Sequence, residues 1–339
     1  SRTDFSFSSG GQATAPVRDF EFQVEQAISR SAEWLLSAQS QEGYWWGELE
    51  ADTTLESDYI VYLHVLSQLD SPKVGKLANY IRRKQLPDGG WNIFEGGPSE
   101  LNATAKAYLA LRLAGDPVDA PHVVRAKEKV IALGGLEATN SYVRFYFAMV
   151  GAIDWNIVPS IPPELMLLPE WVPINIYEMS SWTRGIVIPL SIVYANKPDW
   201  HLPQGVTVNE LFKTKGEKPH SFDWDKRIIT WRNVFLVLDR ALKIYERSRW
   251  KPFRKLALSY ARRWMLERLE RSEGLATIYP AMMNSIYALL AEGEDQDDPL
   301  VDREIKFLAR YEIEDDDTIR VQPCISPVWD TAIAMVSLE

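Results

Sequence analysis

Two short runs of carboxylates are the residues of this chain whose type and spacing could do acid chemistry. One run is Asp-Gln-Asp-Asp at 295–298, and the other is Glu-Asp-Asp-Asp-Thr at 314–318. A carboxyl group donates a proton near neutral pH only when burial and hydrogen bonds raise its pKa. The first run follows Gly293 and precedes Pro299 in a hydrophilic stretch. We therefore expect its carboxylates to lie in a turn, where they are solvated and ionised and do not act as acid catalysts.

Other kinds of chemistry find little support in the residues. The four histidines are scattered without metal-ligand spacing, and no Asp-Asp-x-x-Asp, P-loop or nucleophile motif occurs. We expect no metal and no cofactor. The formal charge of -10 argues against nucleic acid, whose phosphates need cations. The single cysteine, Cys324, excludes an intramolecular disulfide, and no apolar run is long enough to span a bilayer.

A repeated Gln-x3-Gly-x-Trp pattern, in a chain with 13 tryptophans, is the strongest organising signal. It predicts a helix that ends near the Gln, a tight turn at the Gly, and an indole that joins neighbouring helices. The residues of the two copies are Gln39, Gly43 and Trp45, and Gln85, Gly89 and Trp91. Weaker copies occur at 126–135 and 264–274, and in the second of these Leu269 and Leu275 stand where the Gln and Trp would be.

The elements that must position these turns are predicted to be helices, because no window alternates with a period of two residues. Two proline-containing stretches, 155–176 and 197–222, break the helical rhythm. Paired helices at a regular spacing predict an all-α fold, a toroid of helical hairpins. The expected helices are 22–39, 54–69, 73–85, 102–114, 122–133, 140–150, 178–196, 224–246, 251–271, 280–292, 300–311 and 329–338.

At this point the sequence resembles the squalene–hopene and oxidosqualene cyclases, whose QW motifs have the same pattern. The bacterial squalene–hopene branch fits best, over about residues 25–339. The resemblance implies an α/α toroid with QW-type repeats plus the start of a second α/α barrel. The implied domains are a flexible leader at 1–21, the toroid at 22–312 and the start of the second, catalytic barrel at 313–339. The stretches that carry the resemblance are 43–47, 85–91, 174–182, 278–282 and 322–331.

The family converts a linear polyprene into fused rings without a metal, by protonating an alkene and guiding carbocations through an aromatic cavity. The resemblance implies squalene as substrate and hopene-type or hopanol-type pentacyclic products. Cavity-lining and cation-stabilising positions are Trp182, Trp329, Ile278, Tyr279, Met179, Leu49 and Ser57. Of these, Met179 stands where some relatives carry a Phe at the cavity entrance, and Tyr279 stands where some relatives carry a Gln that helps to hold water near the final cation. Asp58, which is Glu in some relatives, would order water or receive a proton at the chain-terminating end.

The family's protonating acid is the central Asp of a D-x-D-D-T motif that follows the 322–331 block by some tens of residues. Both runs of carboxylates lie before the expected place, so we expect the acid beyond Glu339 and the chain alone to be inactive. The implied partners are squalene and a membrane surface, with a homodimer as an option, and the implied location is the cytoplasmic face of the cell membrane. Apolar residues within 224–238 and 165–171 would form the membrane-facing surface, next to basic side chains.

Two other interpretations stay open. The chain could be a noncatalytic helical-toroid binding module, or part of a cyclase for another polyprene or for oxidosqualene. A downstream D-x-D-D-T motif with more QW turns would favour the enzyme, whereas a stop near Glu339 would favour the module.

Overall fold

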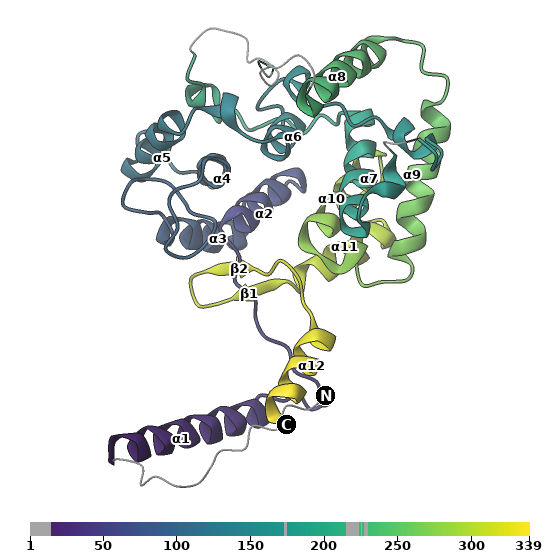
Figure 1. The fold of residues 1–339 in the computed structure, drawn as a ribbon. Coiled ribbons are helices and arrows are strands. Elements are labelled where there is room, and N and C mark those ends of the chain that lie inside the picture. Colours follow the sequence, from purple (N-terminus) through teal and green to yellow (C-terminus); the bar gives the residue numbers. More distant parts are fainter. Residues whose placement is uncertain (1–14, 173–174, 215–223, 225, 227–229) are drawn as a thin grey trace. The chain divides into compact units, whose positions relative to one another are not determined.

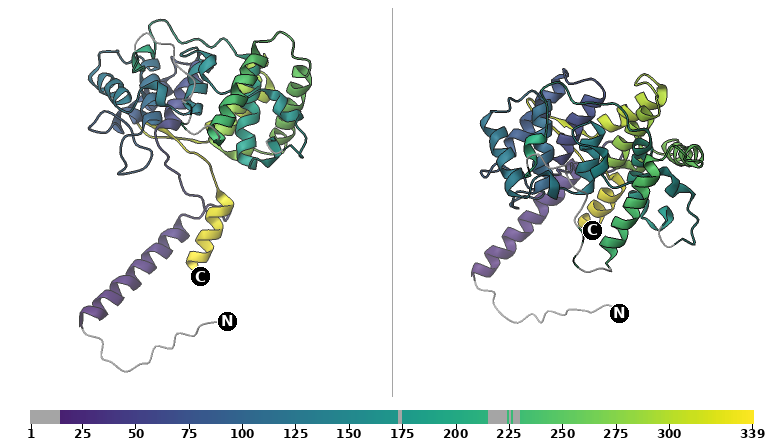
Figure 2. Two further views of the ribbon diagram at one scale, coloured as in Figure 1. Left: turned by 45° about the horizontal axis from the view of Figure 1, so that its top comes forward. Right: turned by 90° about the horizontal axis from the view of Figure 1, so that it is seen from above.

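The computed structural model describes residues 15–172, 175–214, 224, 226 and 230–339 (Figure 1, Figure 2). Within these ranges the chain is mostly helical, which confirms that part of the prediction. It divides into two compact units, one formed by Ser1–Glu48 with Ile325–Glu339 and the other by Leu49–Cys324. We call them the terminal unit and the central unit. The domain boundaries expected from the sequence remain predictions.

The terminal unit pairs the first and last helices of the chain. Helix α1 is Ala15–Ser37 and helix α12 is Pro327–Leu338. Between the two, the backbone N–H of Trp45 donates to Oγ1 of Thr331 at 2.9 Å, and that of Gly47 donates to Oδ2 of Asp330 at 3.0 Å. The turn that follows α1 is therefore bonded to the first turns of a helix nearly 300 residues away. Part of the predicted leader, from Ala15 onward, is helical.

The first part of the central unit is a series of short helices in which buried and half-buried members alternate. Helix α2 packs against α3 and α4, and α4 packs against α5. Helices α2, α4 and α6 are apolar around most of their circumference and are almost entirely buried, whereas α3 and α5 bury one face only. The helices are α2 (Thr54–Val65), α3 (Pro72–Arg83), α4 (Leu101–Leu113), α5 (Pro121–Ala132) and α6 (Ser141–Met149).

The same alternation continues in the second part of the central unit. Helix α10 packs against α7 and α11, and α7 also packs against α9. Helices α7 and α10 supply buried apolar residues on most sides, while α9 and α11 lie outside them with exposed polar faces. The helices are α7 (Ser181–Asn196), α8 (Trp231–Arg247), α9 (Arg254–Leu269), α10 (Tyr279–Ala291) and α11 (Pro299–Ala309).

Several short elements connect these helices. The proline-rich 155–176 stretch forms single turns of 3-10 helix, which need few backbone donors and so suit residues that lack an N–H. Helix α8 begins at Trp231, later than predicted, and residues 215–223, 225 and 227–229 of the predicted loop and helix lie outside the described residues. The 3-10 turns are η1 (Leu136–Ala138), η2 (Trp155–Ile157), η3 (Pro163–Leu167), η4 (Ile176–Glu178), η5 (Asn209–Leu211) and η6 (Leu275–Thr277).

A small β-hairpin corrects the prediction of a purely helical chain. Strand β1 (Glu312–Glu314) pairs antiparallel with β2 (Ile319–Val321), with Ile313 opposite Arg320. Each strand has three residues, which is too short for an alternating pattern to show in the sequence. The hairpin exists because tertiary contacts hold it: the ammonium of Lys73 on α3 binds both carboxylate oxygens of Glu312, at 2.8 and 2.7 Å.

Within the described residues, no helix combines the length and the hydrophobicity needed to cross a bilayer.

Candidate functional site

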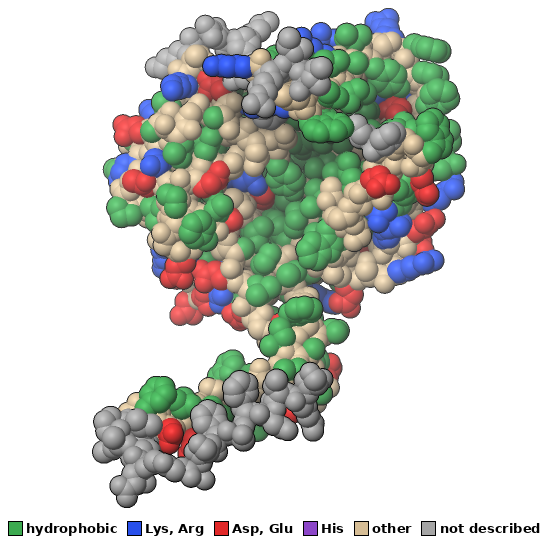
Figure 3. Space-filling model, viewed as in Figure 1, with side chains coloured by type: hydrophobic (Ala, Val, Ile, Leu, Met, Phe, Trp, Pro, Cys, Tyr) green, Lys and Arg blue, Asp and Glu red, His purple; other side chains and the backbone are tan. Residues whose placement is uncertain are grey.

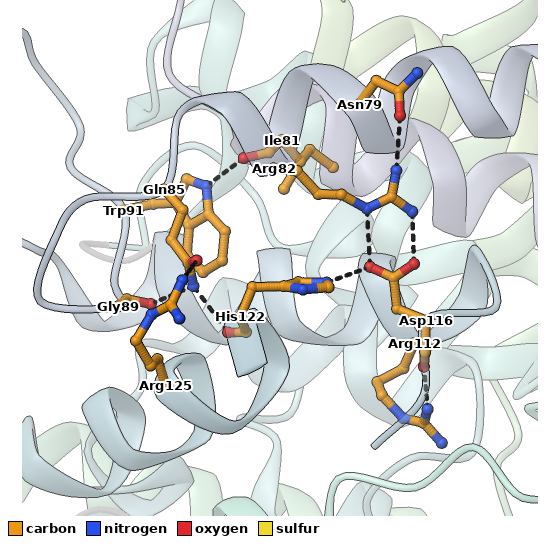
Figure 4. Close-up of polar contacts among 10 residues, drawn as sticks. All are labelled: Asn79, Ile81, Arg82, Gln85, Gly89, Trp91, Arg112, Asp116, His122 and Arg125. Atoms are coloured by element: carbon orange, nitrogen blue, oxygen red, sulfur yellow. Dashed lines mark hydrogen bonds and ion pairs between the residues drawn. The ribbon is translucent and has the colours of Figure 1, made fainter. Parts of the chain in front are cut away.

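The QW turn after α3 shows what the repeated pattern does (Figure 4). The side-chain amide of Gln85 donates to the carbonyls of Gly89 at 2.9 Å and His122 at 2.8 Å. The indole N–H of the fully buried Trp91 donates to the carbonyl of Ile81 at 2.8 Å, in the last turn of α3. The Trp91 bond adds a second donor to a carbonyl in the last turn of α3, and the Gln85 bonds close the turn and link it to α5 (Pro121–Ala132). Gly89 has φ of +90°, and a Cβ there would lie 2.7 Å from Cβ of Arg125.

The turn after α1 repeats these contacts in the terminal unit. The amide of Gln39 donates to the carbonyl of Gly43 at 2.8 Å, and the indole of Trp45 donates to the carbonyl of Leu35 at 2.6 Å. In the central unit a threonine of the following helix, Thr104, accepts from the tryptophan backbone, as Thr331 does here. The two copies of the pattern therefore build the same hairpin, and their role in it is structural.

Asp116, a buried acid in the loop after α4, links this loop to α3 and α5 beside the second turn (Figure 4). The guanidinium of Arg82 on α3 donates twice to the carboxylate of Asp116, at 3.0 and 2.5 Å, and Nε2 of His122 on α5 lies 2.5 Å from the same group. Burial raises the pKa of Asp116, but the hydrogen bonds from Arg82 and His122 outweigh it, and the net effect is a lowered pKa. This network supports the turn.

The most unusual group in the central unit is a buried ion pair between α2 and α4. The ammonium of Lys106 lies 2.7 Å from Oδ2 of Asp58, and both side chains are less than 10% exposed. Burial raises the pKa of Asp58 above its ordinary range, and the positive charge of Lys106 opposes that rise. A carboxylate with a raised pKa is a better proton acceptor than a solvated one. The pair therefore provides a base in a largely apolar environment.

Aromatic rings surround this ion pair. The ammonium of Lys106 lies 5.1 Å from the ring centre of Tyr142 and 5.3 Å from that of Tyr146. The hydroxyl of Tyr146 donates to Oδ1 of Asn284 on α10 at 2.5 Å. The ring of Tyr287, also on α10, meets that of Tyr146 edge-on at 6.1 Å. Within the described residues the hydroxyl of Tyr287 and Nδ2 of Asn284 have no hydrogen-bond partner, so this cluster keeps polar atoms available for a ligand or water.

The predicted residues Tyr279, Ser57 and Asp58 lie in or beside this cluster. Tyr279 stacks on Tyr59 at 6.3 Å, and its hydroxyl donates to the carbonyl of Leu55 at 2.9 Å. Its backbone N–H donates to the carbonyl of Pro323 at 2.9 Å. Burial is the main reason why the pKa of Tyr279 lies well above 10, and the charge of Asp58 adds to it. Ser57 is fully buried on α2, where its hydroxyl donates to the carbonyl of Thr53.

A second buried carboxyl group, Glu56, lies one residue before Ser57. Its Oε1 accepts from the backbone N–H of Val321 at 2.8 Å, while Oε2 has no partner among the described residues. Burial raises its pKa from the ordinary 4.5 to about 8, although the hydrogen bond from Val321 lowers it. Glu56 is therefore mostly protonated at neutral pH.

The remaining predicted residues of the central unit lie around its surface. Trp182, in the first turn of α7, is 65% exposed and lines a pocket with Ala276 and Thr277. Ile278 is half-buried next to these residues and forms a β-bridge with Cys324. Met179 is also half-buried, at the end of η4. Leu49 is partly exposed, and its backbone N–H donates to Oε1 of the buried Gln322 at 3.0 Å.

Trp329 belongs to the terminal unit. It lies in the first turn of α12 and is 68% exposed. The structure describes the two units separately, so the common cavity expected for Trp182 and Trp329 remains a prediction.

The two runs of carboxylates lie at the surface. In the first, Asp298 is the N-cap of α11 and accepts from the backbone N–H of Leu300 at 2.8 Å. In the second, residues 314–317 form the exposed turn of the β-hairpin, where Asp317 pairs with Arg83 and Glu314 pairs with Lys76. The hydrogen bond and the charge of Lys76 lower the pKa of Glu314, so that group is ionised at neutral pH and holds no proton to donate.

Sequence reasoning missed Lys106, Glu56 and the tyrosines Tyr142, Tyr146 and Tyr287. One signal was available, because Lys106 is the only charged residue of 103–111, where its neighbours are small or apolar. A lysine in such a helix is buried and needs a partner. The tyrosines had no signal of their own, since only the packing of α6 against α10 brings them together.

Comparison with known proteins completes the description of the site. The family model described as "Squalene-hopene cyclase N-terminal domain" matches residues 28–317. A squalene–hopene cyclase from Zymomonas mobilis is 37% identical over 317 residues, covering 91% of this chain and 48% of the relative. One from Alicyclobacillus acidocaldarius is 35% identical, covering 93% of this chain and 49% of the relative.

A relative with a different name is equally similar. The dammaradiene synthase of Dryopteris crassirhizoma is 35% identical over 320 residues, covering 93% of this chain and 46% of the relative. The chain thus spans about half the length of the curated relatives that it matches.

Proposed function

The chain belongs to the squalene–hopene cyclase family, and from this premise we propose that it forms one half of an enzyme that converts squalene to hopene-type or hopanol-type pentacyclic triterpenes. The reaction is started by a proton and needs no metal or other cofactor: loss of a proton from the final cation makes hopene formation an isomerisation, whereas capture of water by that cation gives a hopanol. In this proposal the chain supplies part of the cavity wall and the surface that meets the membrane.

The observation that carries the proposal is the aromatic and apolar interior of the central unit. Figure 3 shows hydrophobic side chains gathered in a hollow over α2 and α10. On these two helices, four buried tyrosines form a connected group of rings with centres 5.2 to 6.3 Å apart: Tyr59, Tyr62, Tyr279 and Tyr287. The faces of aromatic rings attract cations, and an apolar hollow excludes the water that would quench a carbocation early.

We infer a toroid from the order of the helices. The almost fully buried helices α2, α4, α6, α7 and α10 would form the inner layer, and the half-buried α3, α5, α9 and α11 the outer one. In the terminal unit, α1 and α12 meet through the same turn contacts as α3 and α4. We propose that these two helices are the outer and inner members of one hairpin of the second barrel.

We propose that Asp58 acts at the chain-terminating end of the cavity. Its raised pKa suits a group that receives a proton or orders a water molecule. The ion pair with Lys106 stabilises the negative charge of the buried carboxylate. Tyr279 and Ser57 would border the same end, and Leu49 and Ile278 would extend its wall. Trp182 and Trp329 would stabilise cations earlier in the reaction, and Met179 would lie at the entrance.

The proton donor that starts the reaction would lie in the other half of the enzyme. Neither run of carboxylates in this chain has the burial that would keep a carboxyl group protonated. On this proposal the 339-residue chain is inactive by itself.

We propose that α8 and its neighbours bind a membrane surface, on the cytoplasmic face of the cell membrane. Helix α8 buries only Asn233 and Leu236, and large apolar side chains cover much of its exposed surface. Such a helix binds at the lipid interface through its apolar face. The exposed apolar residues of α8 and the segment that follows it are Trp231, Val234, Phe235, Val237, Leu238, Ile244, Trp250 and Phe253.

The test is to incubate the complete gene product with squalene and to analyse the products by gas chromatography and mass spectrometry. We expect pentacyclic hydrocarbons or alcohols. Trp182→Leu removes the π face and should lower kcat by about 30-fold, the equivalent of about 2 kcal/mol of cation–π stabilisation, whereas Trp182→Phe should lose much less. Cyclisation of oxidosqualene alone would change the proposed substrate. A product such as the dammaradiene in the name of the Dryopteris crassirhizoma relative would change the proposed product. Absence of any cyclised product would favour a noncatalytic module.

A further inference from the structure

A pocket of about 490 Å³ lies between the first turn of α7 and the last turns of α9, next to η6. Three arginines line it, Arg184 from α7 and Arg268 and Arg271 from the end of α9. Two tryptophans, Trp182 and Trp264, line it as well. A single small pocket thus combines three guanidinium groups with two large aromatic faces.

None of these arginines forms an ion pair with a described residue, although the chain as a whole is acidic. The guanidinium of Arg268 lies over the Trp264 ring, 3.8 Å from its centre, and donates to the Trp264 carbonyl at 2.9 Å. The Nε atom of Arg184 is buried and has no partner among the described residues. Arg262 on α9, by contrast, binds the carboxylates of Glu292 and Glu294.

The charges in the pocket are not balanced from within. Glu267 is the only carboxylate that lines it, so one negative charge faces three positive ones. Burial lowers the pKa of Arg268, and although Glu267 opposes this, repulsion from Arg184 and Arg271 contributes to the net lowering. The remaining charge of about +2 matches the dianion of a phosphate monoester. The first turn of α7 adds the positive end of a 16-residue helix.

The pocket exists because the copy of the QW turn at 264–274 is incomplete. In the intact copies, the Gln amide binds the Gly carbonyl within the turn, and the Trp indole binds a carbonyl of the preceding helix. Here Leu269 and Leu275 take their places, and the hydroxyl of Ser272 lies 2.7 Å from the carbonyl of Gly274. The backbone turns away through Ala276, which has φ of +55°. The substitution leaves a lined space where the other hairpins have a packed indole.

We propose that this pocket binds the phosphate group of a phosphate ester that has an apolar body. The planar guanidinium fork matches phosphate oxygens with paired hydrogen bonds, so three such groups favour phosphate over a lone halide. The indole faces of Trp182 and Trp264 would hold the apolar body, and the volume suits a small molecule. Squalene carries no phosphate, so this ligand differs from the proposed substrate, although the pocket shares Trp182 with the proposed cavity wall.

The test measures the binding of three probes to the complete gene product by isothermal titration calorimetry. The probes are inorganic phosphate, dihexanoyl phosphatidic acid below its micellar concentration, and dihexanoylglycerol, which lacks phosphate. We expect the first two to bind and the third not to bind. Similar affinity for the first two would contradict the role of the indole faces in holding an apolar body, whereas at least about tenfold tighter binding of the lipid would support that role and indicate a lipid headgroup as the source.

Variants decide whether the arginines carry the binding. Arg268→Gln and Arg271→Gln should each raise the dissociation constant for phosphatidic acid about tenfold or more, the loss expected for a charge-assisted hydrogen bond. Arg268→Lys should show an intermediate loss, because it keeps the charge but not the fork. Arg263→Gln is the matched control: Arg263 is on the same helix and also lies over an aromatic ring, that of Tyr260, but it does not line this pocket.

Two results would overturn the proposal. The first is that neither phosphate nor phosphatidic acid binds to the unaltered protein. The second is that Arg263→Gln weakens binding as much as Arg268→Gln, which would indicate general attraction to a basic surface. Equal thermal unfolding midpoints of all variants would show that the comparison reports binding and not folding.

Discussion

Replacing Glu56 with Gln should make the stability of the protein much less dependent on pH. The folded chain buries Glu56 between α2 and β2, where only one of its two oxygens has a partner. Burial raises the pKa of this group from 4.5 to about 8. Gln keeps the shape and the acceptor for the Val321 N–H but cannot ionise.

The magnitude follows from the linkage between proton binding and unfolding. Between pH 4.5 and about 8, the folded state holds a proton on Glu56 that the unfolded state has released. The free energy of unfolding therefore falls as the pH rises through this window, by about 1.4 kcal/mol per pH unit and about 5 kcal/mol in all. Below pH 4.5 both states are protonated and the contribution is fully present. Above about 8 it has been lost.

The assay compares thermal unfolding midpoints of the two proteins at a series of pH values. From pH 5.5 to 7.5 the difference between Glu56→Gln and the unaltered protein should grow by about 3 kcal/mol, or about 6 °C at about 2 °C per kcal/mol. Glu314→Gln, at an exposed position of the hairpin, is the control and should show no such growth. A difference for Glu56→Gln that stays constant with pH would refute the reasoning, because it would mean that Glu56 is ionised in the folded state.

Two further predictions concern the ion pair and the apolar surface. Lys106→Met should destabilise the protein by about 3–5 kcal/mol, because it leaves Asp58 buried without its counter-charge. In chemical denaturation, the double variant Asp58→Asn/Lys106→Met should recover most of that loss. Equal losses in the single and double variants would contradict a role for the charge. Trp231→Ser with Phe235→Ser should reduce flotation of the protein with anionic phospholipid vesicles by about tenfold or more, because about 100 Å² or more of apolar area is lost. Replacing Phe94 with Ser, at an exposed apolar position remote from α8 in sequence, is the control, and an equal effect would argue against α8 as the contact.

The positions of the helices were predictable, whereas the strands were not. Long runs with helical periodicity identify α3, α5 and α11 because each must bury one face and expose the other. The start of α8 was predicted too early, because apolar residues before Trp231 continue the helical pattern. Glu312 and Val321 pair in strands only because Lys73 and Glu56 reach them from other elements.

The candidate site was predictable to a smaller extent. Asp58 and Tyr279 were identified by resemblance to a family, and the structure brings both into one buried cluster. Lys106 was not identified, although a lone charge among small apolar residues was a usable signal. The three unpaired arginines at the incomplete turn gave no signal, because arginines near a helix C-terminus are common on ordinary surfaces.

The sequence by itself determined the repeated turns, the helical class and the family, because these depend on local bonds between residues a few positions apart. Gln85 can bind Gly89, and Trp91 can reach Ile81, wherever the hairpin lies in the molecule. Only the tertiary structure decided which charges are buried together and which remain unbalanced. The partner of Asp58 is 48 residues away and that of Glu56 is 265 residues away. Coulomb energy and desolvation depend on distance in space, to which separation along the chain gives no guide.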